Sequence, residues 1–482
     1  MSSSELKPQG LSSNPANEPG REDFPLSDFD HTLPKIYTQV TLTFKLEDDV
    51  DRQAVIENLI VGLQRTLSQY RSLRGTLQTD VATGKLWIRK EKHSTVEFIV
   101  NWMEGTEDDF PSFEALENKD FPAAMLDGDS LLPLHVTHKA PLTPLGESGD
   151  DNNPILVVQA NIIRGGLILA VAVHHSCSDG PGMNGFLSQW AENTRCVLTG
   201  ATPTPFDPVV LDRSPLTSKD SARKSVVNDV NEAPFSFTVA KTPPAPPQDF
   251  KMPRLSQVML HFPADRLARL REDANPPGQS GASSYDAIVA ILWRCMTRAR
   301  VPLLRPERSA ESRLLHAVGL RQFMKPPLPA RFLGNALALP TPSMEIGTLL
   351  DDGALPQIAS VIRASIQEAT SKDSIKKTAD WIASVPNKSC ITLTTKNFLG
   401  LDIAGASWRR MTPYQEHDFG FGFPKALRWP KPMVDGYFFI YPHRPKDDPR
   451  EGVELNVCLE ASCMKRLLAD EELAQYAHPR GI

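Results

Sequence analysis

The stretch His174-His175-Ser176-Cys177-Ser178-Asp179-Gly180 decides how the rest of the chain is interpreted. It directly follows a predicted hairpin, in which the β-rich runs Ile155–Ile163 and Leu167–Val173 flank the glycine turn Arg164-Gly165-Gly166. Loops at strand ends are where a scaffold presents reactive groups. The sequence therefore predicts a functional loop at the end of a strand, with a helix over Phe186–Val197 after it.

His175 is the candidate general base of this loop. Imidazole has an ordinary pKa of about 6.5, which suits it to accept a proton from a hydroxyl or amine near neutral pH. Adjacent residues of a strand point to opposite faces, so we expect the ring of His174 to pack on the other side, in the core. Asp179 is expected to lie near the base, where orienting the backbone, binding an arginine and relaying a proton all remain open.

Two other interpretations of the loop are weaker. The hexapeptide Gly180-Pro181-Gly182-Met183-Asn184-Gly185 matches the glycine pattern of dinucleotide-binding folds, but that pattern must directly join a strand to a helix. Here a polar segment intervenes. Cys177 could act as a covalent nucleophile beside His175 only if the turn folds back. We therefore expect no nucleotide site and favour Cys177 as a small buried residue.

A second motif, Asp418-Phe419-Gly420-Phe421-Gly422, lies near the C-terminus, where its two glycines permit a turn that other residues do not. No kinase catalytic loop or phosphate loop accompanies it, and no Gly-x-Ser-x-Gly elbow of a serine hydrolase is present. A metal site would need side chains from both motifs, yet no spacing typical of metal ligands supports it and we expect no metal. The residues considered for it are His174, His175, Asp179, His417 and Asp418.

Composition excludes several classes of protein. Of the 482 residues 40% are hydrophobic and 23% charged, which is typical of a globular enzyme. The net charge is −6, with scattered basic residues, so a nucleic-acid partner is not expected. The longest apolar runs fall far short of the roughly 20 residues that span a bilayer. With no signal peptide and six cysteines in no paired pattern, we expect a cytoplasmic protein whose thiols stay reduced.

The chain divides at a proline-rich segment. Residues 201–254 contain ten prolines and no sustained periodicity, which predicts a long linker. We expect a disordered tail over 1–22, a first domain over 23–200 and a second over 255–482. Helical and strand-like patterns alternate in both halves, including a capping box at Ser283-Ser284-Tyr285-Asp286, so each half is predicted to be an α/β domain with a sheet covered by helices.

His175-x-x-x-Asp179-Gly180 and Asp418-Phe419-Gly420-x-Gly422, in this order, closely resemble the motifs of the BAHD acyltransferases. The resemblance runs from about Phe24 to the C-terminus and is greatest to the fungal branch, which includes the trichothecene 3-O-acetyltransferases. Further matches lie between and beside the two motifs; they include Ser283-Ser284-Tyr285-Asp286, Ala290-x-x-Trp293-Arg294, Arg321, Pro326-Pro327-Leu328-Pro329, Phe332-x-Gly334-Asn335 and Ser407-Trp408.

This resemblance implies two chloramphenicol-acetyltransferase-like domains, each a mixed sheet covered by helices, joined by a long crossover loop. It also implies an active site in a tunnel between them. Acyl-CoA, here expected to be acetyl-CoA, enters as a co-substrate, and no cofactor is bound permanently. The other partner is a small hydroxylated natural product, the expected reaction is a direct transfer in a ternary complex, and the protein is expected to be a monomer.

The resemblance also implies roles for individual residues. His175 would deprotonate the acceptor, and Asp418 is placed with it in the catalytic set although its loop is expected to be mainly structural. Asp179 would pair with Arg321. The remaining residues fall into two groups: Gly180, Gly420 and Gly422 are expected to shape the site, and Ser283, Ser284, Ser407 and Trp408 to bind substrate or CoA.

This sequence departs from the pattern at Phe421, where plant members commonly have tryptophan, and at Ala406, where some members carry a threonine. The second departure leaves open which group stabilises the oxyanion. Two alternatives to this family assignment stay open. One is a free-standing peptide-synthetase condensation domain, which shares the histidine motif but takes its acyl group from a carrier protein. The other is a non-catalytic relative that kept the fold.

Overall fold

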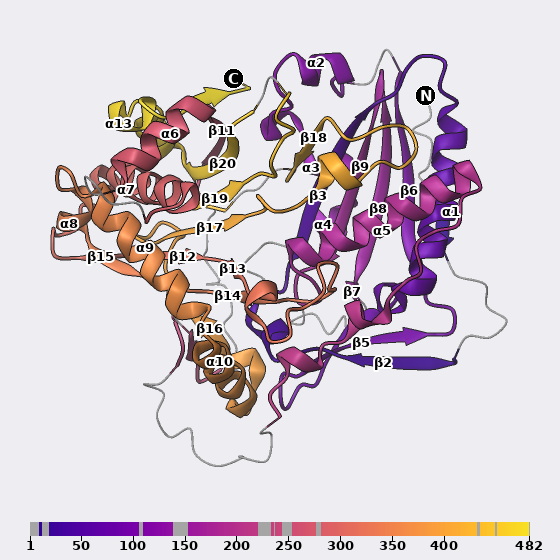
Figure 1. Cartoon of the computed structure of the whole chain (residues 1–482), viewed down its shortest axis with the longest axis horizontal. Helices are drawn as coiled ribbons and strands as arrows, with labels where there is room; N and C mark the ends of the chain where they lie inside the picture. Colours follow the sequence, from indigo (N-terminus) through magenta and orange to yellow (C-terminus); the bar gives the residue numbers. More distant parts are fainter. Residues whose placement is uncertain are drawn as a thin grey trace.

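Two mixed sheets, each covered by helices, form the framework of the computed structural model (Figure 1). The structure describes residues 9–11, 19–105, 109–137, 153–219, 233–235, 237–242, 253–275, 281–430, 434–448 and 451–481. The predicted α/β class, with one main sheet in each half, is confirmed.

The first main sheet has the strand order β1-β6-β8-β9-β3-β18. The predicted hairpin is its centre: β8 and β9 pair antiparallel, and every residue of both strands is buried. Buried strands of this kind need cover on both faces. Helices α1 (Arg52–Gln69) and α5 (Gly180–Thr199) cover one face, and the short helices α2 (Phe113–Glu117), α3 (Gly128–Leu131) and α4 (Leu134–Thr137) cover the other. The strands are β1 (Gln9–Leu11), β3 (Tyr37–Lys45), β6 (Val96–Met103), β8 (Leu156–Ile163), β9 (Gly166–His174) and β18 (Ala426–Arg428).

Helix α5 begins six residues before the predicted start at Phe186. The side chain of Asp179 caps it by accepting a hydrogen bond from the backbone N–H of Gly182, and Pro181 occupies the first turn, where its missing N–H costs nothing. The glycine-rich sequence that resembles a loop is therefore the first turn of a helix.

The second main sheet has the strand order β15-β12-β17-β19-β20-β11-β21. Its long helix α7 (Ser284–Leu304) starts with the predicted capping box of Ser283 and Asp286. The strands are β11 (Leu255–Phe262), β12 (Glu311–His316), β15 (Ser343–Glu345), β17 (Ile403–Ser407), β19 (Tyr437–Ile440), β20 (Val453–Glu460) and β21 (His478–Arg480). The other helices of this half are α6 (Ala264–Asp273), α8 (Ile346–Leu350), α9 (Leu355–Ala369), α10 (Lys372–Ser384), α11 (Pro413–Glu416), α12 (Ala461–Leu468) and α13 (Glu471–Ala474).

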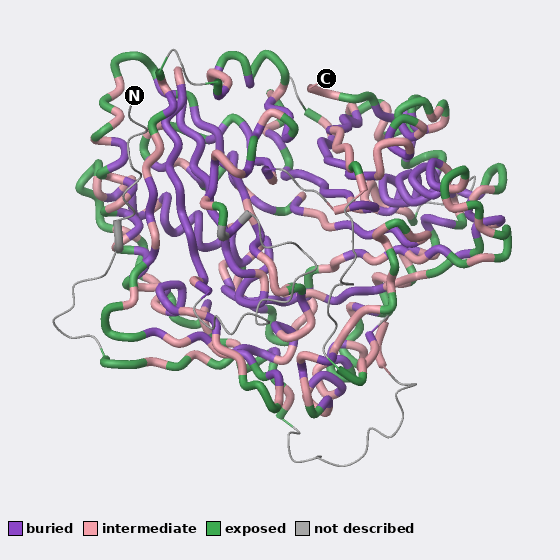
Figure 2. Tube along the Cα trace, turned by 180° about the vertical axis from the view of Figure 1, so that it is seen from behind, coloured by how far each residue is buried: buried purple, intermediate pink, exposed green. Residues whose placement is uncertain are grey.

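Three small sheets complete the strands of the described residues. A four-stranded sheet has the order β2-β5-β4-β7, and two strand pairs are β10-β16 and β13-β14. Their bounds are β2 (Arg21–Pro25), β4 (Thr76–Thr79), β5 (Leu86–Glu91), β7 (Asn153–Pro154), β10 (Phe237–Val239), β13 (Val318–Gly319), β14 (Leu337–Ala338) and β16 (Ile391–Leu393). The purple strands of Figure 2 show that the buried residues concentrate in the main sheets and the elements that cover them.

The structure corrects the predicted boundaries in three places. Residues 9–11 and 21–22, predicted as tail, belong to β1 and β2. In the predicted linker, β10 pairs with β16 of the second half. Strand β18 comes from the predicted second domain but pairs with β3 of the first sheet, where it covers an edge that would otherwise be left open. Arg428 of β18 then bonds Glu454 of β20 at 3.3 Å, which links the two sheets.

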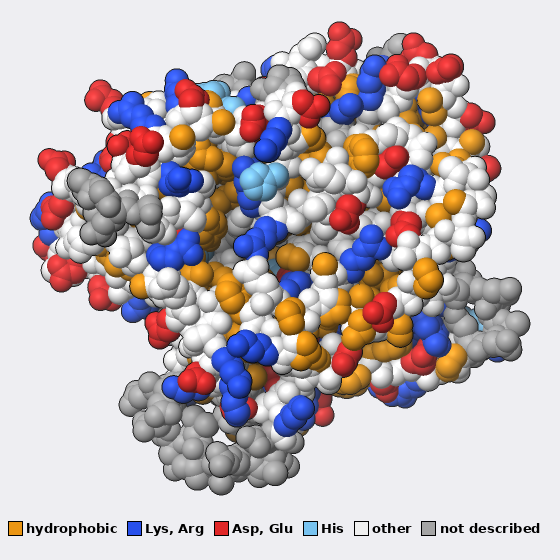
Figure 3. Space-filling model, viewed as in Figure 1, with side chains coloured by type: hydrophobic (Ala, Val, Ile, Leu, Met, Phe, Trp, Pro, Cys, Tyr) orange, Lys and Arg blue, Asp and Glu red, His pale blue; other side chains and the backbone are white. Residues whose placement is uncertain are grey.

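The surface carries acidic and basic side chains interspersed over the face shown in Figure 3, in keeping with the small net charge. Among the described residues, no helix combines the length and apolar character that crossing a bilayer requires.

Candidate active site

His175 lies in the turn that joins β9 to α5, directly after the last residue of the strand. Its backbone N–H donates to the carbonyl of Ile36 at 2.8 Å, and its own carbonyl accepts from Nδ2 of Asn335 at 2.8 Å. Burial lowers the pKa of the half-buried imidazole below its ordinary value, although the carboxylate of Asp179 acts in the opposite direction. The ring is therefore neutral near pH 7, as a proton acceptor must be.

His174 is fully buried and does not share this position. Its ring packs edge-to-face on Tyr37, with the ring centroids 5.4 Å apart, and its Nδ1 lies 3.2 Å from the backbone nitrogen of Ser176. The expectation that it packs in the core is confirmed.

Asp179 is fully buried and forms the predicted ion pair with Arg321. The pairing is bidentate, with Nη1 of Arg321 at 2.8 Å from Oδ2 and Nη2 at 2.7 Å from Oδ1. The backbone N–H groups of Gly182 and Ala336 complete the shell, at 2.9 and 3.0 Å. All four partners are hydrogen-bond donors outside His175, so the carboxylate orients backbone and binds arginine rather than relaying a proton.

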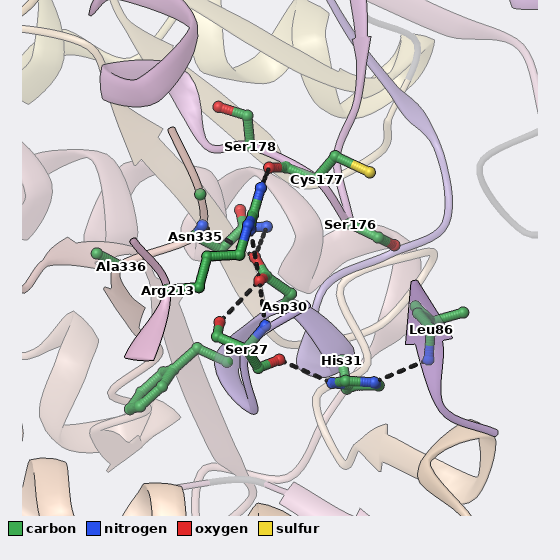
Figure 4. Close-up of polar contacts among 12 residues, drawn as sticks. Ser27, Asp30, His31, Leu86, Ser176, Cys177, Ser178, Arg213, Asn335 and Ala336 are labelled. Atoms are coloured by element: carbon green, nitrogen blue, oxygen red, sulfur yellow. Dashed lines mark hydrogen bonds and ion pairs between the residues drawn. The ribbon is translucent and has the colours of Figure 1, made fainter. Parts of the chain in front are cut away.

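The turn is held from a third side by Asn335 and by Asp30 and Arg213, the last two of which the sequence analysis missed. Asp30 and Arg213 form a buried ion pair at 2.6 Å, and Nη2 of Arg213 donates to the carbonyl of Cys177 at 2.7 Å (Figure 4). Asn335 donates to Asp30 as well as to His175. No local motif marks Asp30 or Arg213, because 183 residues separate them in the chain and only the fold brings them together.

Trp408 lies against the same turn. A Cβ atom added to Gly180 would lie 2.7 Å from Nε1 of the Trp408 indole, which itself stacks on Trp429 with an interplanar angle of 4°. The predicted pair Ser407-Trp408 is therefore beside the loop through Trp408, whereas the Ser407 hydroxyl accepts from the backbone N–H of Arg409 at 3.3 Å. Only glycine at position 180 allows this close approach.

Substituting Gly180 by alanine is therefore expected to displace the indole or the start of α5. We expect a loss of about 1–3 kcal/mol in the free energy of unfolding, as for other overpacked sites, and a reduced turnover rate. Chemical denaturation and steady-state kinetics measure both. Gly200→Ala would not be a clean control because that residue has a φ of +67°, so Gly281→Ala, with open space around its Cβ position, is the matched variant. A Gly180→Ala protein as stable and active as the parent would contradict this close contact.

Ser283 and Ser284 lie at the N-terminus of α7 and make no described contact with the turn at 174–180. The Ser283 hydroxyl caps the helix through Asp286, and Arg363 bonds both Ser283 and Asp286. Ser283 thus has a structural role in this arrangement, and its predicted role in binding stays a prediction.

Asp418 uses its carboxylate within its own loop. Oδ1 accepts from the N–H groups of Gly420 at 2.8 Å and Gly422 at 3.0 Å, and both glycines have positive φ angles, of +104° and +97°. Phe419 packs on Trp190, with ring centroids 5.1 Å apart. This geometry supports the structural role of the loop and not the catalytic role expected for Asp418, since neither partner of its carboxylate is a reacting group.

The described residues contain one cluster of possible metal ligands, and it lies elsewhere. It consists of Cys295, Asp470 and Glu472, whose carboxylates are already paired with arginines: Arg298 with Asp470 at 2.7 Å and Arg294 with Glu472 at 2.8 Å. Among the described residues, the two histidines of the loop do not join His417 and Asp418 in such a cluster.

Cys177 is buried in the core of the first sheet, and burial strongly raises the pKa of its thiol. A protonated thiol is a poor nucleophile. We therefore expect Cys177→Ala to keep most of the activity, and mass spectrometry of the parent with acetyl-CoA alone to show no acetyl group on this residue. A folded but inactive variant, together with an acetylated thiol in the parent, would instead establish a covalent intermediate.

Comparison with known proteins shows the family and the fold of this chain. Residues 13–474 match the model of the Transferase family. Over 483 aligned residues the chain is 29% identical to acetyltransferase FGR3 of Gibberella zeae, covering 97% of this chain and 92% of FGR3. It is 23% identical to the trichothecene 3-O-acetyltransferase TRI101 of Fusarium sporotrichioides, covering 92% of this chain and 94% of that protein. The crystal structure of F. graminearum TRI101 with coenzyme A and T-2 mycotoxin superposes with a TM-score of 0.77 and 20% identity, over 95% of this chain and 99% of that one. The chain thus belongs to the Transferase family, as its resemblance to the BAHD acyltransferases indicated.

Proposed function

We propose that the protein is an acyl-CoA-dependent O-acyltransferase that transfers an acetyl group from acetyl-CoA to a hydroxyl of a small secondary metabolite. The observation that carries this proposal is the position of His175 directly after β9, in a turn that Arg321 and Asn335 of the second half hold in place. Burial lowers the pKa of its imidazole, which favours the neutral form that a general base needs. The relatives named above, which are acetyltransferases, support the choice of acyl group and acceptor.

The proposed chemistry needs one base. His175 removes the proton of the acceptor hydroxyl as its oxygen attacks the thioester carbonyl, and the tetrahedral intermediate collapses to the ester and the thiolate of CoA. The protonated imidazole then returns the proton to that sulfur. A thioester is already activated, so base catalysis, stabilisation of the oxyanion and exclusion of water are sufficient. Asp179 takes no proton in this scheme because its oxygens are engaged by other donors.

The proposal includes a cytoplasmic monomer. All six cysteines are free and buried, which fits a protein kept in a reducing compartment. Size-exclusion chromatography with light scattering tests the oligomeric state.

The function is tested by incubating the purified chain with acetyl-CoA and a panel of hydroxylated natural products. We expect release of free CoA that depends on the acceptor, and a product heavier by one acetyl group. Free CoA can be detected with a thiol-reactive dye. The background reaction of this dye with the enzyme should be small because every cysteine is buried. Transfer only from an acetyl-loaded carrier protein would favour the condensation-domain alternative, and no transfer from either donor would favour a non-catalytic relative.

The pH dependence of kcat/KM should report His175. Since burial lowers the pKa of the imidazole, the ring stays neutral at a pH below the ordinary pKa of histidine. Activity should fall only when the pH drops through that lowered pKa. We expect an acidic limb with an apparent pKa below about 6.5, measured as kcat/KM between pH 4.5 and 9. An acidic limb centred above this value would contradict the assignment.

A further inference from the structure

We propose that Arg213, held by Asp30, is a positioning residue for His175. Asp30, Arg213 and Asn335 together form what we call the carbonyl clamp: Asn335 and Arg213 donate to the backbone carbonyls of His175 and Cys177, and Asp30 accepts hydrogen bonds from both of these donors. The proposal rests on the proposed function, because it assigns the clamp to the loop that carries the base.

The clamp answers a need of the backbone. Between the end of β9 and the first turn of α5 the chain pairs with neither a strand nor a helix, yet residues 176–179 are buried. Buried carbonyls that find no partner cost free energy comparable to a lost hydrogen bond. Asn335 satisfies the carbonyl of His175 at 2.8 Å and Arg213 that of Cys177 at 2.7 Å. The two bonds fix the backbone on both sides of Ser176.

Asp30 holds both donors of the clamp. Its Oδ1 accepts from the backbone N–H and Nδ2 of Asn335 at 3.0 and 2.8 Å, and its Oδ2 accepts from Nη1 of Arg213 at 2.6 Å. The N–H and hydroxyl of Ser27 also donate to Oδ2, each at 2.7 Å. With five donors on one fully buried carboxylate, neither the guanidinium nor the amide can turn away from the loop (Figure 4).

The segment between the two halves, residues 201–254, also supplies a residue that contacts the loop. Arg213 lies within residues 201–254, and Ser218 of the same segment donates its N–H to Asp28 at 2.7 Å. The short 3-10 helix Phe29–Thr32, with Asp28 before it and Asp30 within it, thus anchors this segment at two points. This anchoring places the guanidinium of Arg213 against the backbone of the loop that carries His175.

A displaced base should affect the chemical step more than binding, since misplacing a reacting group by about 1 Å can cost around 10²-fold in rate. For Arg213→Gln we expect kcat to fall at least tenfold with KM changed less than threefold. Arg213→Lys keeps the charge for Asp30 but lacks the planar fork that reaches two acceptors, so it should lie between Arg213→Gln and the parent.

The experiment compares these variants with Arg331→Gln. Arg331 bonds Gln189 and Glu192 of α5, at 3.0 and 3.2 Å, and among the described residues no hydrogen bond or ion pair joins it to the turn at 174–180, so its loss should leave kcat unchanged. A second readout needs no activity: the rate at which iodoacetamide labels each of the six buried cysteines, resolved by peptide mass spectrometry. We expect Arg213→Gln to lower the melting temperature, because it leaves the buried carboxylate of Asp30 without its cation, and to accelerate labelling of Cys177 more than that of the other five cysteines.

The outcomes separate the two proposals. A kcat within twofold of the parent, or equal acceleration at all six cysteines, would overturn the positioning role, the second because it indicates general destabilisation. If the parent transfers no acetyl group but Arg213→Gln selectively exposes Cys177, the clamp on the loop stands and the proposed function fails. Loss of kcat with selective labelling, partly restored in Arg213→Lys, supports both.

Discussion

Replacing His175 by alanine is expected to lower acetyl transfer by a factor of about 10² to 10⁴, the range that a general base contributes. The fold should survive, because alanine keeps the two main-chain hydrogen bonds of position 175: its N–H to the Ile36 carbonyl, and its carbonyl from Nδ2 of Asn335. Steady-state kinetics with acetyl-CoA, beside thermal unfolding of the same preparation, measures the two effects separately.

His174→Ala is the matched control, since it removes the same imidazole from the adjacent position. Its ring packs on Tyr37 in the core, so this variant should lose stability while keeping far more activity and the acidic limb of the parent. The base would have to be sought elsewhere if His175→Ala retained activity within tenfold of the parent, or if His174→Ala were the more damaging change.

The parts of the fold that local physics determines could be predicted from the sequence. The hairpin of β8 and β9 follows from two β-rich runs around a glycine turn, and the start of α7 from a capping box whose members are three residues apart. The pairing of Asp179 with Arg321 was implied by the family resemblance and is present. Each of these rests on residues close in sequence or on a motif.

What could not be predicted depends on partners far apart in the chain. Strand β18 lies in the second half of the sequence, yet it joins the first sheet because it pairs with the open edge of β3. Asp30 and Arg213 look like ordinary surface charges until the fold buries them together under the loop. The first turn of α5 could not be predicted, because glycine and proline normally indicate a loop. The residue that caps this turn, Asp179, is held in place by the distant Arg321.

Asp179→Ala is expected to damage stability and activity together. The change leaves the guanidinium of Arg321 without its carboxylate. Breaking a buried ion pair in this way typically lowers the free energy of unfolding by about 3–5 kcal/mol. It also removes the N-cap of α5, worth about 1 kcal/mol. The backbone N–H of Ala336 loses its acceptor as well, so the turn that carries His175 loses part of its attachment to the second half of the chain. Denaturant unfolding followed by circular dichroism measures the stability, and kcat the activity.

Two variants show whether the buried charge is the cause. Glu192 lies on the same helix α5 and forms an ion pair with Arg331, which Glu192→Gln breaks. That pair is partly exposed, so its loss should cost no more than about 1 kcal/mol. In Asp179→Ala/Arg321→Ala the unpaired charge is gone, and the double variant should be more stable than Asp179→Ala alone while remaining poorly active, because the cap and the link to Ala336 are still missing. If Asp179→Ala unfolded within 1 kcal/mol of the parent, or if the double variant were less stable than the single one by the full cost of a second lesion, the burial of an uncompensated arginine could not be what makes Asp179 necessary.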